Sequence, residues 1–300
     1  AVAEAGRRTT SRRDLARHER FTEVSPEVGV IDPDALSEFL EDDPDAALAL
    51  LADMVSATDD QLRAMARAQA GRVMVDAART GPQRQRGVGK LRRAPLESHQ
   101  GDVDLDASLD ELVRSRRSNS APNPAEVTVT TWARPEVALC LLVDRSGSMA
   151  GDRLAAAAVA AAAVMFRAPN DVSVVAFAED AVVVCAQDER RSPEDVVSDL
   201  LRLRGFGVTD VGLALRVAAT QLGRSGAGRR IAVLLSDCRA TTGGEPLRHL
   251  TGVDELVVLA PEGDTADAEA LADAIGARWT AVGGPSSVAE ALQRVLGPPT

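Results

Sequence analysis

Short apolar runs alternate with longer segments of helical periodicity from residue 137 to the end of the chain. The runs are rich in Val, Leu and Ala with no polar alternation, which is typical of strands buried on both faces of a parallel sheet. We therefore predict an α/β fold: a doubly wound, mostly parallel sheet with helices on both faces. The expected strands are 137–143, 172–177, 229–236, 256–260 and 279–282, with 181–185 as an antiparallel edge strand. The expected helices are 152–167, one from Pro193, 211–222, 266–275 and a last one with a capping box from Ser287 to Glu290.

Residues 31–80 have a different pattern, which predicts a small helical domain ahead of the sheet. Asp32-Pro33 and Asp43-Pro44 each place a capping residue before a proline at the first helical position. Thr58 is expected to cap a third helix that ends at Arg79. One face of this third helix is predicted to be buried from its i, i+3 and i+4 spacing. That face consists of Leu62, Met65, Ala66, Gln69, Val73 and Ala77.

The flanking segments are expected to carry little regular structure. Residues 1–30 are polar and Arg-rich, and we interpret them as a flexible, solvated N-terminal arm. Residues 81–133 are interpreted as a linker, because 81–95 combine five bases with three glycines and two prolines. This basic strip could dock on an acidic partner or on phosphate, but a solvated hinge is the simpler interpretation. The main domain then spans 134–300.

Two elements are nevertheless predicted inside the linker. A short helix is expected after an acidic stretch, capped by Asp106 or Ser108 and burying Leu109, Leu112 and Val113. The stretch is no calcium loop of the EF-hand type, because Ala and Val stand where that loop requires Gly and Glu. The alternating residues 127–132 predict a strand that enters the main domain.

Polar residues follow the first apolar run of the main domain at alternate positions. Asp144, Ser146 and Ser148 stand in the turn after strand 137–143, and ligands of open α/β sheets bind at this edge. One carboxylate and two hydroxyls are hard oxygen ligands, which suit Mg²⁺ or Mn²⁺ better than zinc. A turn of this kind is expected to be exposed, so removal of Asp144 is expected to cost little stability. Taken singly, the two serines could simply cap helices.

The Asp144-x-Ser146-x-Ser148 turn resembles the metal-ion-dependent adhesion site of von Willebrand factor A (VWA) domains. In that family a Thr and an Asp from two later loops complete the metal ligands. Thr209 and Asp237 stand at matching places, the second directly after a predicted strand. The resemblance covers about residues 134–300. One departure is Cys238, because the family usually has Gly after the last Asp.

The resemblance implies a recognition site that uses a metal ion. In the family, a Glu or Asp from a partner protein fills the open coordination position of a bound Mg²⁺ or Mn²⁺. A VWA domain preceded by a helical region is similar to proteins that work with MoxR-type AAA+ ATPases, and the acidic stretch at 102–106 is a further likeness to this ATPase-linked branch. We therefore expect a metal-dependent protein-binding adaptor with an AAA+ ATPase partner. A subunit of a magnesium or cobalt chelatase is the alternative, although such subunits usually carry a degenerate ATPase domain for which residues 1–135 offer no matching pattern.

An enzyme is the less favoured interpretation. An Asp after a buried strand is also the nucleophile of haloacid-dehalogenase-type phosphotransferases, but those carry a second Asp two residues later as general acid. That position is Ser146 here, and the only lysine of the chain is Lys90, outside the main domain. No Walker A sequence is present. His18, His99 and His249 are scattered and form no evident pair with a serine.

Charge and cysteine content limit which partners and which cellular compartment we expect. The net charge is −11, and residues 136–300 hold 22 acids against 15 bases, so a nucleic-acid partner is not expected. Three cysteines without C-x-x-C spacing suggest reduced thiols and a cytoplasmic protein. Cys140 and Cys185 lie in apolar runs and are expected in the core. The first residues show no signal-peptide pattern, and no apolar run reaches the roughly 20 residues that span a bilayer.

Overall fold

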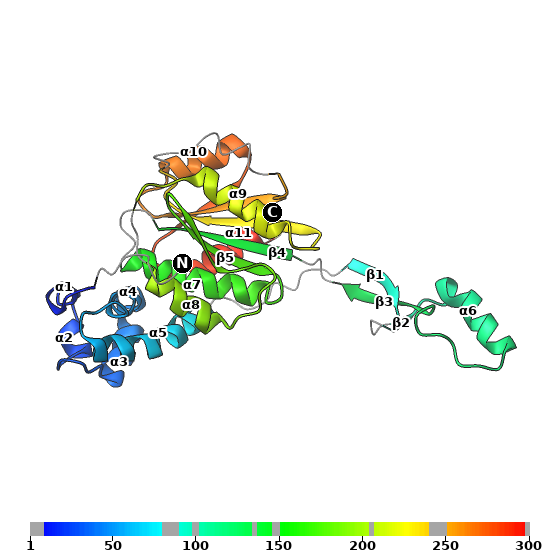
Figure 1. Ribbon diagram of the computed structural model, residues 1–300, viewed down its shortest axis with the longest axis horizontal. Helices are drawn as coiled ribbons and strands as arrows, with labels where there is room; N and C mark the ends of the chain where they lie inside the picture. Colours follow the sequence, from blue (N-terminus) through cyan, green and yellow to red (C-terminus); the bar gives the residue numbers. More distant parts are fainter. Residues whose placement is uncertain are drawn as a thin grey trace. The chain divides into compact units, whose positions relative to one another are not determined.

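The computed structural model describes residues 9–79, 90–97, 102–133, 137–145, 151–203, 207–239 and 251–297. The chain divides into two compact units (Figure 1). One unit combines residues 1–83 with 137–300, and the other consists of residues 84–136.

A six-stranded sheet forms the centre of the larger unit. Its strands are β4 (Val137–Asp144), β5 (Val172–Phe177), β6 (Ala181–Cys185), β7 (Arg229–Leu235), β8 (Glu255–Pro261) and β9 (Arg278–Val282). The spatial order is β6-β5-β4-β7-β8-β9, with β6 antiparallel and all other pairings parallel. The predicted mostly parallel sheet with an antiparallel edge is confirmed. Because the chain runs outward from β4 to β5 and later returns to β7 on the other side, the topological switch point lies between β4 and β7.

Helices cover both faces of this sheet (Figure 1). One face holds α7 (Asp152–Arg167), α8 (Pro193–Arg202), the short η2 (Pro285–Ser287) and α11 (Val288–Leu296); the other holds α9 (Val211–Leu222) and α10 (Ala266–Ile275). Successive residues of β4 enter the two cores in turn, because side chains of a strand alternate between faces. Leu139 and Leu141 belong to one core, and Ala138 and Cys140 to the other.

The N-terminal helices pack on the outer side of α7 and α8. They are α3 (Pro33–Asp42), α4 (Pro44–Met54) and α5 (Asp60–Arg79), and α4 and α5 both contact α7. Helix α7 therefore has the sheet on one side and the helical region on the other, which buries 11 of its 16 residues. This double burial explains why α7 is apolar almost all round.

The segment before α3 is not the predicted solvated arm. Residues 9–31 contain the short helices α1 (Arg12–Leu15) and α2 (Phe21–Val24), and their apolar side chains are buried. The arginines that suggested a solvated segment cover aromatic rings instead. The guanidinium of Arg12 lies 4.9 Å from the ring centre of Phe21, and that of Arg20 lies 5.2 Å from that of Phe39.

Two helix starts and one helix face differ from the prediction. Asp59, not Thr58, caps α5, since its Oδ1 accepts from the Leu62 amide at 2.7 Å. The Ser287 hydroxyl bonds to the backbone of Gly284, so it forms no capping box with Glu290. The buried face of α5 is turned relative to the predicted one, because α7 and α8 as well as α4 pack against this helix. It consists of Leu62, Ala66, Ala70, Gly71, Met74, Val75 and Ala78.

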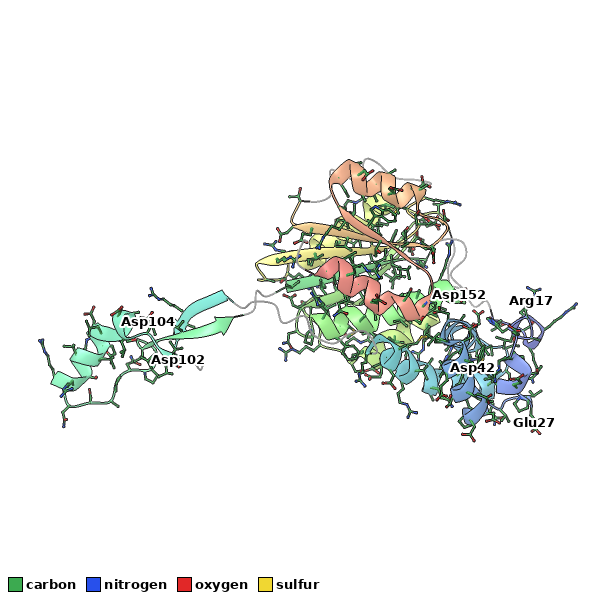
Figure 2. The ribbon with its side chains drawn as sticks, turned by 180° about the vertical axis from the view of Figure 1, so that it is seen from behind. Arg17, Glu27, Asp42, Asp102, Asp104 and Asp152 are labelled. Atoms are coloured by element: carbon green, nitrogen blue, oxygen red, sulfur yellow. The ribbon has the colours of Figure 1, made fainter. Side chains whose placement is uncertain are left out.

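The smaller unit replaces the expected linker with an antiparallel sheet and a helix. The strands β1 (Lys90–Pro95), β2 (Asp102–Val103) and β3 (Thr128–Ala133) pair in the order β1-β3-β2. The predicted helix and a strand near 127–132 are present, but the strand belongs to the sheet of this smaller unit instead of entering the main domain. The helix is α6 (Leu105–Arg117), and its cap is Asp104, which is labelled in Figure 2, rather than Asp106 or Ser108.

Helix α6 buries its polar face, contrary to the prediction. Leu109 and Val113 are exposed, whereas Ser108, Glu111 and Ser115 are buried. Hydrogen bonds account for the reversal. The Ser108 hydroxyl accepts from the Thr128 amide at 3.0 Å, and Glu111 Oε1 accepts from the Asn123 amide at 2.7 Å. Across the described ranges, no helix is both long and apolar enough to cross a bilayer.

Candidate metal centre

Three of the five candidate ligands lie at the carboxyl edge of the sheet, around the switch point. Asp144 is the last residue of β4, and Ser236-Asp237 directly follow the neighbouring strand β7. Thr209 precedes α9. Ser146 and Ser148 lie outside the described residues, and their part in the site stays a prediction. The arrangement agrees with the rule that open α/β sheets bind ligands at such an edge.

Asp144 accepts hydrogen bonds from two hydroxyls that come from different loops. Its Oδ2 accepts from Ser236 Oγ at 2.6 Å and from Thr209 Oγ1 at 3.4 Å. All three side chains are buried, with Asp144 at 9 % exposed. The expectation of an exposed turn is therefore wrong for Asp144. A buried carboxylate that accepts hydrogen bonds contributes to stability, so its removal should have a cost.

The second carboxylate of the site, Asp237, is held by arginine. Its Oδ2 lies 3.4 Å from Arg153 Nη1, and its Oδ1 accepts from the Arg239 amide at 3.1 Å. Asp264 lies within 4.0 Å of Arg153 and accepts from Arg239 at 2.7 Å. These two arginines offset part of the negative charge at the rim of the site.

Cys238, which stands where the resemblance leads us to expect Gly, has a backbone conformation that glycine adopts without strain. Its φ is 60°, in the left-handed region that favours glycine. Its amide donates to Ser236 Oγ at 2.8 Å, which holds the loop beside Asp144. Burial raises the pKa of the Cys238 thiol to about 12, so the sulfur is protonated at neutral pH.

The turn between β5 and β6 supports two loops of the site. The Arg145 amide donates to the Phe177 carbonyl at 2.8 Å, and the Asp210 amide donates to the Ala178 carbonyl at 3.1 Å. The Arg145 side chain is 1 % exposed and forms an ion pair with Asp180 of the same turn. The loops that carry Asp144 and Thr209 are thereby attached to one rigid hairpin.

Sequence reasoning did not single out Ser236, Arg145 or Arg153. Ser236 could have been found, because a hydroxyl directly before Asp237 at a strand end must lie near the adjacent strand end at Asp144. The interactions of Arg145 and Arg153 depend on tertiary contacts with Asp180 and Asp237, and spacing along the chain gives no signal for them.

The donor set fits a hard cation. It consists of carboxylate and hydroxyl oxygens, and neighbouring oxygens around octahedral Mg²⁺ lie about 3 Å apart. The 3.4 Å between Thr209 Oγ1 and Asp144 Oδ2 is close to that spacing. Within the described residues, no three His, Cys, Asp or Glu side chains gather as a metal cluster. A metal here would therefore depend on neutral hydroxyls, as Mg²⁺ sites with few carboxylates do.

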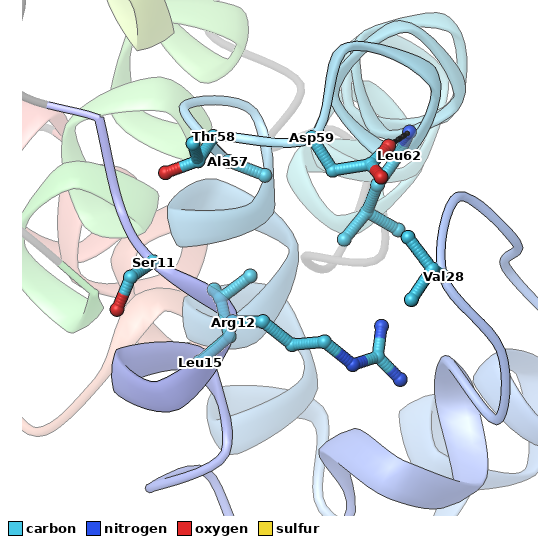
Figure 3. Close-up of a pocket in the computed structure, with 8 residues that line it drawn as sticks. All are labelled: Ser11, Arg12, Leu15, Val28, Ala57, Thr58, Asp59 and Leu62. Atoms are coloured by element: carbon cyan, nitrogen blue, oxygen red, sulfur yellow. Dashed lines mark hydrogen bonds between the residues drawn. The ribbon is translucent and has the colours of Figure 1, made fainter.

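One cavity of about 340 Å³ lies elsewhere, in the helical region (Figure 3). Its lining is mainly apolar and contains no cluster of acids, so it carries no metal chemistry. The lining residues are Ser11, Arg12, Leu15, Val28, Ala57, Thr58, Asp59 and Leu62.

Comparison with known proteins agrees with this fold. Residues 139–240 match the sequence pattern of the family described as von Willebrand factor type A domain. This match, together with the mostly parallel six-stranded sheet flanked by helices, identifies a VWA domain in the larger unit. No curated protein sequence matches the chain.

Solved structures with related folds are distant. A von Willebrand factor type A protein from Catenulispora acidiphila is 21% identical over 56% of this chain and 43% of its own, with a TM-score of 0.44. The type V pili tip protein Mfa5 from Porphyromonas gingivalis is 19% identical over 39% and 22%, with a TM-score of 0.33. An aerotolerance-related membrane protein from Bacteroides fragilis is 19% identical over 54% and 98%, with a TM-score of 0.39. The chain spans less than half the length of the first two.

Proposed function

We propose that this protein is a metal-dependent protein-binding adaptor whose VWA domain recognises a carboxylate of a partner. The observation that carries the proposal is the meeting of Asp144, Thr209 and Ser236 oxygens at the switch point of the sheet. Asp144, Ser146, Ser148, Thr209 and Asp237 would hold Mg²⁺, or Mn²⁺ in its place. The bound ion would offer an electrophilic position for an Asp or Glu side chain of the partner.

Residues of this chain would prepare that position. Ser236 orients the Asp144 carboxylate, and Arg153 and Arg239 hold Asp237. Two carboxylates leave a divalent ion nearly neutral, and the arginines at the rim reduce repulsion of an incoming carboxylate. The proposal contains no catalytic step. A phosphate ester turned over by the wild type but not by Asp144→Asn would overturn this part.

For the partner we propose an AAA+ ATPase of the MoxR type in the cytoplasm. A helical region followed by a VWA domain is the sequence organisation that supports this partner. The three cysteines are buried free thiols, which is consistent with a reducing compartment. The described part of residues 9–133 consists of helices and a small antiparallel sheet, without the strand–helix alternation of an ATPase domain. These described residues therefore give no support of their own to the alternative of a chelatase subunit.

Calorimetric titration with Mg²⁺ and Mn²⁺ tests the metal site. We expect one site in the wild type, loss of binding in Asp144→Ala and weaker binding in Thr209→Ala. Asp273→Ala is the matched control, because Asp273 is an exposed carboxylate on α10. Equal binding by wild type and Asp144→Ala would refute the assignment.

Capture of the ATPase by the full-length chain tests the partner. Binding should be lost in EDTA and return with Mg²⁺. It should survive moderate salt, since the metal contact is short-range and the acidic chain does not steer an acidic partner. If the partner binds equally well with and without EDTA, and equally well to Thr209→Ala and wild type, the metal centre is not the recognition site.

A further inference from the structure

Helix α4 carries an acidic residue near each end, and both acids bind the start of a helix in the VWA part. Asp53 Oδ1 accepts from the Gly151 amide, directly before α7, at 3.0 Å. Asp45 Oδ1 accepts from the Ser286 amide, within η2 ahead of α11, at 2.7 Å. The helical region is thus joined to the VWA part by two carboxylate–amide bonds as well as by apolar packing.

Helix α7 has a glycine at its N-cap position. Gly151 has φ 53° and ψ −121°, and it offers no side chain of its own to cap the first turn. The first amides of a helix have no partner within the helix, and its N-terminal end favours a negative charge. Asp53 supplies both an acceptor and a charge. Asp53, almost 100 residues earlier in the sequence, therefore caps the start of α7.

Asp53 is itself held in place. Its second oxygen, Oδ2, lies 3.0 Å from His18 Nε2, and the two side chains are only 14% and 23% exposed. Asp152 begins α7 and is labelled in Figure 2. Burial and then the Asp45 carboxylate raise the pKa of Asp152, with a smaller contribution from Asp53, whereas His18 lowers it. When protonated, His18 offsets a local excess of negative charge around the start of α7.

Gly151 also ends the segment that carries the candidate ligands. Ser148 is three residues before Gly151, so their Cα atoms can be at most about 11 Å apart. The other end of the segment is Asp144, fixed in β4 and bonded to Ser236. The ligand-bearing segment therefore runs between two anchors, one in the sheet and one supplied by the helical region.

We propose that Asp53, oriented by His18, is a positioning residue that sets the metal affinity of the VWA domain. This inference rests on the proposed function. It gives the N-terminal helices a role in the site: they fix the point at which the metal-binding segment passes into α7. A protein that displaced α4 would thereby weaken metal binding without touching a ligand.

Four variants of the full-length chain test this inference by Mg²⁺ calorimetry. Asp53→Ala should weaken binding about 10-fold, as loss of a partner behind the ligands typically does. Asp53→Asn keeps an acceptor for the Gly151 amide and should recover most of the affinity. The Mg²⁺ affinity of His18→Ala should lie between that of wild type and that of Asp53→Ala. Asp45→Ala is the matched control, because it removes an equivalent bond from a helix without candidate ligands and should leave the affinity unchanged.

Hydrogen exchange in EDTA provides a readout that needs no metal. Amides 151–155 should exchange at least several-fold faster in Asp53→Ala than in wild type or Asp45→Ala. Unchanged exchange, or equal Mg²⁺ affinity of Asp53→Ala and wild type, would overturn the inference, as would an equal loss in Asp45→Ala. A wild type that binds no Mg²⁺ while the exchange difference persists would instead refute the proposed function and leave Asp53 as a structural cap. If Asp53→Ala does not fold, His18→Ala, with its intermediate loss of affinity, carries the same comparisons against wild type and Asp45→Ala.

Discussion

Ser236 and Asp144 are 92 residues apart in sequence, and a 2.6 Å hydrogen bond joins their side chains in the buried end of the sheet. The bond connects the carboxyl ends of β4 and β7, the two strands on either side of the switch point. The same hydroxyl accepts from the Cys238 amide. Ser236 therefore determines the position of the first carboxylate and the path of the loop that carries the second.

Ser236→Ala should lower both stability and Mg²⁺ affinity. A hydrogen bond to a charged acceptor contributes about 1.5–3 kcal/mol, so we expect a loss in that range by urea unfolding. Ser225→Ala is the matched control, since its hydroxyl donates to Asp171 ahead of β5, at the opposite end of the strands. The control should lose stability and keep its Mg²⁺ affinity. The same affinity loss in both variants would argue against a local effect.

Cys238 and Cys140 should respond in opposite ways to glycine. At Cys238 the left-handed backbone strains every residue with a Cβ by about 1–2 kcal/mol, so Gly should be more stable than Ala there. Cys140 lies in the middle of β4, where Gly should be less stable than Ala by roughly 0.5–1 kcal/mol. Thermal unfolding of the four variants checks this crossed order. A higher unfolding temperature for the Ala variant than for the Gly variant at both positions would contradict this prediction.

The buried thiols should resist modification in the native protein. Burial raises the pKa of Cys140 and of Cys238 to about 12, and it also raises that of Cys185. At pH 8 only roughly one in 10⁴ of a thiol with such a pKa is thiolate. Thiol titration with a chromogenic disulfide should therefore find three reactive groups only after unfolding. Rapid native labelling of any one of them would show that its segment opens.

Glu255 should stabilise the sheet at neutral pH and lose this effect in acid. It forms ion pairs with Arg229 and Arg278, and the hydrogen bond from Arg229 is the largest cause that lowers its pKa below 4.5. A depressed folded pKa contributes stability above the unfolded value, and the contribution is lost as the pH falls through the folded value. Glu255→Gln should thus be less stable than wild type at pH 7, with the gap closing below pH 4.5. Urea unfolding across this range measures it.

Helix α6 should depend on its polar face. Glu111→Ala removes the acceptor of the Asn123 amide and should lower local stability by about 1–3 kcal/mol. Leu109→Ala should change little, because Leu109 is 57% exposed. Hydrogen exchange over residues 102–133 in the full-length chain separates the two. Greater loss in Leu109→Ala would mean that its side chain is covered in solution.

The sheet and the site were predictable to different degrees. Apolar runs marked the inner strands β4, β5, β7 and β8, because strands buried on both faces of a parallel sheet tolerate them. The edge strands β6 and β9 are partly exposed and gave shorter signals. Asp144 and Asp237 could be placed at one edge, since the parallel strands that precede them end there together. Thr209 directly follows no strand of the described residues and could be placed there only by the resemblance to VWA domains. The proposal that these residues bind a metal still rests on residue types and spacing, with Ser146 and Ser148 outside the described part.

Other features could not be found from local pattern. Phe21 and Val24 are too isolated in an Arg-rich segment to signal burial, and their core is completed by helices far along the chain. In α6, hydrogen bonds from the 123–128 segment to Ser108 and Glu111 outweigh the periodicity of its leucines. The capping of Gly151 by Asp53 joins residues 98 positions apart, and no spacing rule reports such a pair.

The double burial of α7 has a consequence for how this VWA domain can be inherited and handled. A domain that recurs in unrelated proteins as an independent folding unit must have a polar surface when it is isolated. Here a fragment that began at residue 134 would expose the apolar side of α7 that α4 and α5 cover. The N-terminal helices and the sheet are therefore expected to be inherited together as one domain. A fragment without those helices should be recovered mainly as aggregate.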